Sequence, residues 1–156
     1  MTASTQQKIG HVVLNVSSLA RSVPFYESLL GIHEVARMGE AEKKIVGAEM
    51  VFFSFGESHH DLALREVPNG VPVAPESLGL AHVAFKIGEG LTKLQDHAAH
   101  LRAHGIEFAF TRDHIVTQSI YVRDPDGILV EMYVEADAEI WRNDPSKVAT
   151  VLPLDL

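Results

Sequence analysis

The sequence contains no cysteine, which excludes disulfide bonds and thiolate ligands for a metal. Basic residues are scarce: 13 lysines and arginines face 21 aspartates and glutamates, for a formal net charge of −8. Such a charge argues against nucleic acid or an acidic membrane surface as a partner. No apolar run approaches the length of a membrane span, and residues 1–7 lack the pattern of a signal peptide. We therefore expect a cytoplasmic protein with no nucleic-acid and no membrane partner.

Histidine is unusually frequent, with nine residues in the chain. His11 and His82 each precede an alternating apolar run. Alternation predicts strands, in which every second side chain lies on one face. His82 follows His11 by 71 residues, and Glu131 follows His60 by the same 71. The sequence therefore predicts an internal repeat with a potential metal ligand on the first and last strand of each copy.

Each copy has the same order of predicted elements: a strand, a helix and three further strands. Helices predicted from apolar spacing span about 18–30 and 90–104, and Pro24 is expected to bend the first helix or delay its start. We therefore predict an α+β fold of two tandem βαβββ modules that form one structural domain. The predicted limits are 8–66 for the first module, 67–79 for a linker rich in proline and glycine, 80–135 for the second module and 136–156 for a C-terminal tail.

Glu131 interrupts a stretch that otherwise has the pattern of a buried strand. A buried carboxylate is costly unless it is paired or bound to a metal. We therefore predict that His11, His82 and Glu131 are metal ligands. Two histidines and one carboxylate leave adjacent coordination positions open, the usual arrangement for non-haem iron(II) that binds both an organic substrate and oxygen. Imidazole and carboxylate also suit zinc, nickel and manganese, so the ligand set leaves the metal open.

The spacing of these residues resembles that of the vicinal oxygen chelate superfamily, which includes glyoxalases, bleomycin resistance proteins and extradiol dioxygenases. The resemblance covers residues 8–135 and is closer to the type I extradiol dioxygenases, the catechol 2,3-dioxygenase group. It implies that the two modules form a curved mixed sheet around the metal, with Fe(II) as cofactor and Mn(II) as the other candidate. The larger relatives carry four modules and this chain carries two, so the resemblance leaves substrate enclosure open.

Three further residues match catalytic positions of that group. His60 begins a His-Asp-Leu-Ala-Leu segment, and the matching histidine is an acid–base group. Tyr121 lies ten residues before Glu131, and His114 precedes the segment that contains Tyr121 and an Asp-Pro-Asp-Gly turn. The resemblance implies that His60, His114 and Tyr121 are catalytic. The alternatives for His60 are a fourth metal ligand and a structural residue.

The resemblance implies an iron(II)-dependent extradiol dioxygenase of aromatic hydrocarbon catabolism. It would cleave catechol or a substituted catechol with O2 to a 2-hydroxymuconic semialdehyde-type product. The alternatives are a glyoxalase I-like isomerase or lyase with four protein ligands, and a non-catalytic ligand-sequestering module, which would lack the metal residues. We also expect a homo-oligomer, because a single pair of modules leaves sheet edges uncovered and the apolar tail 148–156 offers a docking surface.

The other five histidines are predicted to lie away from the chemistry, and His33, just past the first helix, is expected at the surface. Strand parity directs His59 to the face opposite His60, where a structural role is expected. His97, His100 and His104 lie away from the apolar stripe of the second helix, so we expect a solvated face there rather than a metal site.

Overall fold

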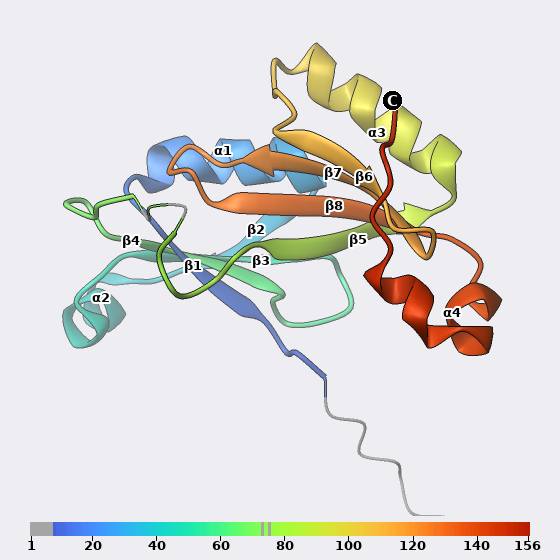
Figure 1. Cartoon of the computed structure of the whole chain (residues 1–156). Coiled ribbons are helices and arrows are strands. Elements are labelled where there is room, and N and C mark those ends of the chain that lie inside the picture. The colour runs from blue at the N-terminus through green and yellow to red at the C-terminus, as the bar shows by residue number, and fades with distance from the viewer. Residues whose placement is uncertain (1–7, 73, 75) are drawn as a thin grey trace, which may run out of the picture. The chain divides into compact units, whose positions relative to one another are not determined.

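Each half of the sequence forms a four-stranded mixed sheet and one long helix, as Figure 1 shows. The computed structural model describes residues 8–72, 74 and 76–156. The chain divides into a first unit, Met1–Glu27 with Gly31–Gly70, and a second unit, Ser28–Leu30 with Val71–Leu156. The predicted α+β class is confirmed. The limits given for the modules, linker and tail remain predictions.

The first unit has the strand order β1–β4–β3–β2, with β1 parallel to β4 and the other neighbours antiparallel. In β1 every second residue is buried from Leu14 on, as a period of two predicts, whereas β3 and β4 bury consecutive residues and β2 is exposed. The buried side chains form the core together with one side of α1. A short helix that the apolar pattern did not predict, α2, lies between β2 and β3. The elements are β1 (Val12–Val16), α1 (Leu19–Leu30), β2 (His33–Arg37), α2 (Glu40–Val46), β3 (Met50–Ser54) and β4 (Leu62–Glu66).

Helix α1 begins where a carboxylate from a distant strand caps it. The Glu66 side chain accepts a hydrogen bond of 2.8 Å from the backbone N–H of Leu19, satisfying one of the donors that a helix start leaves free. Of the two effects expected of Pro24, the delayed start is excluded, because the helix begins at Leu19 and contains Pro24 in its interior. The expected bend remains a prediction. It ends at Gly31, whose φ of 65° is left-handed and favours glycine.

The second unit repeats this arrangement in the order β5–β8–β7–β6, again with the first pair parallel and the others antiparallel. Strands β7 and β8 form a hairpin whose turn is held by Asp124, because its carboxylate accepts from the backbone N–H groups of Asp126 and Ile128. The elements are β5 (Val83–Glu89), α3 (Leu91–Ala103), β6 (Phe110–Asp113), β7 (Thr117–Arg123), β8 (Leu129–Glu135), α4 (Glu139–Asn143) and a 3-10 helix, η1 (Pro145–Ala149).

The C-terminal tail pairs with β6, the edge strand of the second sheet. Leu152 and Asp113 exchange two backbone hydrogen bonds, of 2.8 and 3.0 Å. The Thr111 hydroxyl donates to the carbonyl of Leu154 at 2.5 Å. The tail therefore covers backbone groups that an edge strand would otherwise expose.

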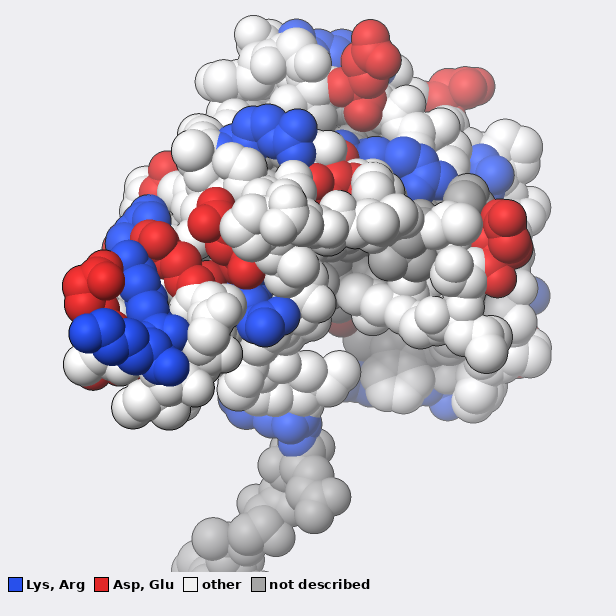
Figure 2. Space-filling view, turned by 90° about the vertical axis from the view of Figure 1, so that its left-hand side faces the viewer, with Lys and Arg blue, Asp and Glu red and all other residues white. Residues whose placement is uncertain are grey.

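Charged side chains of both signs are intermingled on the face shown in Figure 2. In the first unit, Glu49 pairs with Arg37 and with Lys43, each at 3.1 Å, and Arg37 also pairs with Glu34 at 2.8 Å. A face of this kind lacks the concentrated positive charge that nucleic acid requires. Within the part of the chain that the structure describes, no helix combines the length and the apolar character needed to cross a membrane.

Candidate metal centre

The second unit brings His82 and Glu131 together at the junction of β5 and β8. His82 directly precedes β5, and the parallel pairing of the two strands places Ala84 beside Glu131. The Nε2 atom of His82 lies 3.0 Å from Oε2 of Glu131. The other carboxylate oxygen, Oε1, accepts a hydrogen bond of 2.6 Å from the hydroxyl of Ser119. An imidazole nitrogen and a carboxylate oxygen thus converge on one point.

The environment of Glu131 fits a divalent cation. The residue is 7% exposed, and among the described residues no lysine or arginine forms an ion pair with it. A buried carboxylate is costly without a positive partner. A bound divalent cation would supply that charge, and one oxygen with one imidazole nitrogen is a donor set that Fe(II), Mn(II) and Zn(II) all accept.

Tyr121 lies beside this pair, as its position in the hairpin requires. The antiparallel register of β7 and β8 pairs Tyr121 directly with Glu131, and its ring lies edge-on to the ring of His82 with centroids 5.7 Å apart. Burial raises the pKa of Tyr121 to about 12, and the negative charge of Glu131 contributes to the rise. The phenol is therefore neutral at physiological pH and acts as a hydrogen-bonding group rather than as a base.

His114 approaches Tyr121 from the turn between β6 and β7. Its Nε2 atom lies 3.3 Å from the Tyr121 hydroxyl, and its Nδ1 atom lies 2.7 Å from the carbonyl oxygen of Thr150 in the tail. A carbonyl only accepts, so Nδ1 carries a hydrogen, and in the neutral ring Nε2 accepts from the tyrosine. The next residue, Ile115, has a φ of 67°, an uncommon conformation for a β-branched residue. The carboxylate of Asp113 accepts its N–H at 2.6 Å.

Two residues that the sequence did not single out extend this cluster along β6. Phe110 pairs with Tyr121 in the sheet, and their rings stack with centroids 4.4 Å apart. The guanidinium carbon of Arg112 lies 4.8 Å from the centroid of Phe110. Arg112 pairs with Ser119, the residue that holds Glu131. Only the strand register reveals these neighbours, since aromatic, arginine and serine residues are ordinary in strands.

The first unit brings His11 and His60 together. The backbone N–H of Val12 donates to the carbonyl of Asp61 at 3.1 Å, and the two imidazole rings have centroids 4.3 Å apart. Burial lowers the pKa of His60, and the charges of His11 and His59 lower it further, whereas Asp61 opposes them. A neutral His60 at pH 7 is able to accept a proton.

The prediction that His59 points away from His60 is wrong. Their Nδ1 atoms lie 2.6 Å apart, and their ring centroids lie 4.5 Å apart. Side-chain alternation holds only within a strand, and β4 begins at Leu62, after both histidines. His59 therefore joins His11 and His60 in one group of rings.

The prediction of a solvated face on α3 holds for two of its three histidines. His100 and His104 are exposed, but His97 is half-buried and its Nε2 atom has no hydrogen-bond partner among the described residues. Burial lowers the pKa of His97 to about 4. His97 directly precedes the buried Ala98. The buried side of the helix is therefore wider than the stripe of apolar residues predicted from the sequence.

Two of the three predicted metal ligands, His82 and Glu131, therefore form a pair in the second unit, and the third, His11, lies beside His60 in the first unit. No three histidine, aspartate or glutamate side chains are grouped as a complete metal site in the described part of the chain. The assignment of His11, His82 and Glu131 as one ligand set remains a prediction.

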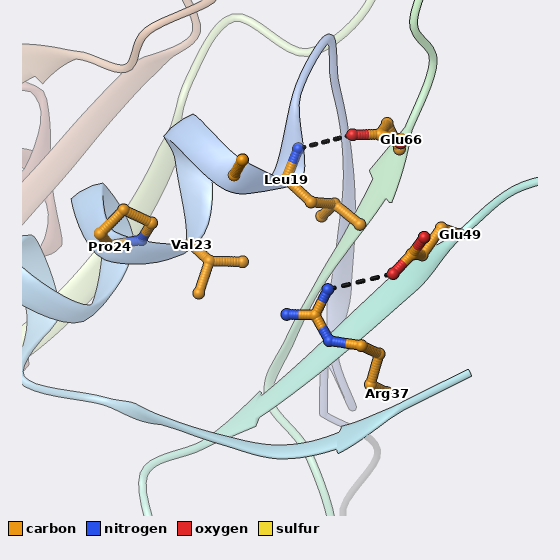
Figure 3. A pocket seen from close by; sticks show the side chains of 7 residues that line it. Leu19, Val23, Pro24, Arg37, Glu49 and Glu66 are labelled. Atoms are coloured by element: carbon orange, nitrogen blue, oxygen red, sulfur yellow. Dashed lines mark hydrogen bonds and ion pairs between the residues drawn. The ribbon is translucent and has the colours of Figure 1, made fainter. Parts of the chain in front are cut away.

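A separate cavity of about 380 Å³ lies in the first unit, between α1 and the sheet (Figure 3). Its polar groups already have partners: Glu66 accepts from Leu19, and Arg37 pairs with Glu49. None of the predicted site residues lines it. The complete lining is Leu19, Ala20, Val23, Pro24, Arg37, Glu49 and Glu66.

Residues 8–132 match the family model of the Glyoxalase/Bleomycin resistance protein/Dioxygenase superfamily, so the chain belongs to this superfamily. Among curated relatives, "Biphenyl-2,3-diol 1,2-dioxygenase 3" of Rhodococcus globerulus is 35% identical over 130 residues, which are 82% of this chain and 63% of the relative. "Catechol-2,3-dioxygenase" of Bacillus subtilis is 28% identical over 143 residues, 87% of this chain and 44% of the relative. The chain thus spans less than two thirds of either dioxygenase. The match to the family model confirms the predicted superfamily.

Other relatives have different chemistry. "Metallothiol transferase FosB" of Staphylococcus epidermidis is 28% identical over 127 residues, 80% of this chain and 81% of the relative. The fold matches a glyoxalase/bleomycin resistance/dioxygenase domain from Frankia with a TM-score of 0.69 at 22% identity, covering 86% of this chain and 96% of that one. It also matches the glyoxalase I of Leishmania major, with a TM-score of 0.66 at 22% identity, covering 91% of this chain and 96% of that one. These structures support the fold alone.

Proposed function

We propose that this chain is a metal-dependent extradiol dioxygenase that cleaves a catechol with O2 to a 2-hydroxymuconic semialdehyde-type product. The observation that carries the proposal is the cluster of His82, Glu131, Tyr121 and His114 in the second unit. It joins two metal-type donors to two hydrogen-bonding groups within one unit. The names of the two dioxygenase relatives agree with this chemistry.

His11, His82 and Glu131 would hold the metal, Fe(II) first and Mn(II) as the other candidate. When bound, such a metal lowers the pKa of the diol hydroxyls and brings the diol and oxygen together. Ser119 would hold the Glu131 carboxylate in position, because its hydroxyl occupies one oxygen and leaves the other free to coordinate. Imidazole and carboxylate ligands suit several divalent metals, so the choice of metal belongs to the proposal.

Tyr121 would position the diol. Its hydroxyl lies 3.3 Å from Nε2 of His114, and the lone pairs of the phenol oxygen would accept a hydrogen from a substrate hydroxyl. Its raised pKa keeps it protonated during the reaction. His60 would take a proton from the diol and return it as the ring opens, a role that its lowered pKa favours because the ring is neutral beforehand.

A metal-dependent transferase or isomerase is the second candidate. The favouring observation is the likeness to "Metallothiol transferase FosB" of Staphylococcus epidermidis, which is 28% identical over 127 residues. Such a reaction consumes no oxygen, so oxygen uptake separates the two candidates.

The test is reconstitution with Fe(II) without air, followed by catechol or 2,3-dihydroxybiphenyl and then air. We expect oxygen uptake in step with a yellow ring-opened product, and no uptake in a Glu131→Gln protein. Full metal occupancy without oxygen uptake on either diol would overturn the proposal. Conversion of a hemithioacetal, or thiol transfer to an epoxide, would then favour the second candidate.

We also propose a homo-oligomer. Strand β2 is an exposed edge, and Val35 on it and Ile45 on α2 are 52% and 86% exposed. Exposed apolar groups beside an open edge favour association. Light scattering at micromolar concentration measures the mass, and a monomer would contradict the proposal.

A further inference from the structure

Arg112 lies on the face of the second sheet that carries the metal-type donors. Its strand, β6, pairs with β7, so that Arg112 stands opposite Ser119 and Phe110 stands opposite Tyr121. The Ser119 hydroxyl bonds to Glu131, which identifies the common face. The charge of Arg112 acts on Tyr121, whose pKa it lowers against the larger effect of burial. A permanent positive charge therefore stands beside the proposed substrate position.

The guanidinium of Arg112 has N–H donors that make no hydrogen bond to the described residues. One nitrogen, Nη1, donates to the carbonyl of Thr111 at 2.8 Å, and the group packs over the ring of Phe110. Among the described residues, no carboxylate forms an ion pair with it. Arg37, in contrast, is held by two glutamates. A guanidinium has five N–H donors in a planar fork that matches a carboxylate, and the described residues provide a hydrogen-bond acceptor for one nitrogen of Arg112, Nη1.

The net negative charge of the chain affects which substrates can approach Arg112. The chain carries a net charge of −8, and a bound divalent metal would offset the charge of Glu131 but not the excess of negative charge on the rest of the chain. An anionic substrate is repelled by such a protein unless a local cation compensates. The stack of Arg112 on Phe110 and of Phe110 on Tyr121 fixes that cation on the ring-binding side of the sheet.

We infer that Arg112 recognises a carboxylate on the ring substrate, so that the preferred substrates are carboxylated catechols such as 3,4-dihydroxybenzoate. This inference rests on the proposed function for the diol half of the substrate. The carboxylate half rests on Arg112, Phe110 and their place in the sheet. The aromatic ring of the substrate would lie along the same stack of rings, with its carboxylate at the Arg112 end.

The test compares turnover of 3,4-dihydroxybenzoate with turnover of 4-methylcatechol, which replaces the charge by a methyl group. We expect the wild-type kcat/KM to favour the carboxylated diol by at least about tenfold, the effect typical of a charged hydrogen bond. Arg112→Gln should lower this ratio by about 10- to 100-fold, mainly through KM, and Arg112→Lys should restore part of it. The matched control is Arg123→Gln, which removes an exposed arginine bonded to the carbonyl of Gly127 and should keep the wild-type ratio.

Equilibrium binding to the metal-free protein separates this inference from the proposed function. Calorimetry with 3,4-dihydroxybenzoate and 4-methylcatechol needs no turnover, and circular dichroism verifies that each variant is folded. A preference for the carboxylated ligand that disappears in Arg112→Gln supports the inference, even if no diol is cleaved. A wild-type protein without that preference, or a folded Arg112→Gln protein that keeps it, overturns the inference, even if ring cleavage is observed.

Discussion

The two carboxylate oxygens of Glu131 have different partners. Ser119 occupies Oε1, whereas Oε2 faces His82. The hydroxyl restricts rotation of the carboxylate, and restrained ligands bind metals more tightly than free ones. We therefore expect substitutions of Glu131 and of Ser119 to weaken metal binding to different degrees.

We expect Glu131→Gln to weaken metal binding by at least about 100-fold, and Ser119→Ala to weaken it by about 10-fold, as loss of an outer partner does. A neutral amide is a poor ligand for a hard cation, yet its oxygen still accepts from Ser119, so the fold should be retained. Metal content per chain after dialysis measures the effect. Glu135→Gln is the control, because Glu135 lies on β8 like Glu131 but pairs with Lys86 of β5. Unchanged metal content in Glu131→Gln would remove this residue from the ligand set.

His60 allows a second prediction at the same scale. If it is an acid–base group, His60→Gln keeps a polar side chain but loses the proton that titrates. Activity per bound metal should then fall by about 10²–10⁴-fold at unchanged metal content. His33→Gln, in the exposed strand β2, is the control. A parallel loss of metal and activity would instead make His60 a ligand, the alternative that favours an isomerase.

Among the secondary-structure elements, the tail has a function beyond covering an edge. The carbonyl of Thr150 fixes the hydrogen of His114 on Nδ1, and the pairing of Leu152 with Asp113 holds that carbonyl in place. Removal of residues 150–156 should lower kcat by about tenfold, since a misplaced hydrogen-bonding group costs 1–2 kcal/mol. It should also change the ¹⁵N shifts of the His114 ring in the metal-free protein.

The control for the truncation is Thr150→Ala in the full-length chain, which removes the side chain and keeps the carbonyl. It should behave like wild type. Circular dichroism and Tm measurements show whether the truncated protein folds. A folded truncated protein with wild-type kcat and unchanged His114 shifts would show that the tail does not position this residue.

Periodicity predicted the strands that carry the site, because β1 and β5 alternate and each is preceded by a histidine. It failed for the segment before β4, where no strand exists to give His59 a parity. It also failed for α2, whose signals are a glycine at each end and acidic residues before basic ones, over only seven residues. Arg112 and Ser119 could not be found without the register, since neither type is unusual in a strand.

For the molecule as a whole, His97 links stability to pH. Its pKa is about 4 in the folded chain and about 6.5 in an unfolded one. Between about pH 6.5 and pH 4 this histidine is protonated in the unfolded chain and neutral in the folded chain. The free energy of unfolding therefore falls as the pH is lowered through this range. Above about pH 6.5 the group is neutral in both states and has no effect on it. After allowance for partial exposure, the loss is about 1 kcal/mol.

We expect His97→Leu to flatten the decline in unfolding free energy between pH 6.5 and 4, as measured by urea unfolding at each pH. His104→Leu removes an exposed histidine from the same helix and should leave the decline as in wild type. Identical pH profiles for wild type and His97→Leu would show that His97 does not couple folding to pH.

The bond from Thr150 to His114 uses a main-chain atom, and this affects how the site can change over evolutionary time. Any residue at position 150 supplies the same carbonyl, so substitutions there can accumulate without altering His114. The family model ends at residue 132, well before this contact. A relative could keep this hydrogen bond without sharing any side chain with this tail. Only a structure in which its tail runs along the strand equivalent to β6 would show that the contact is the same.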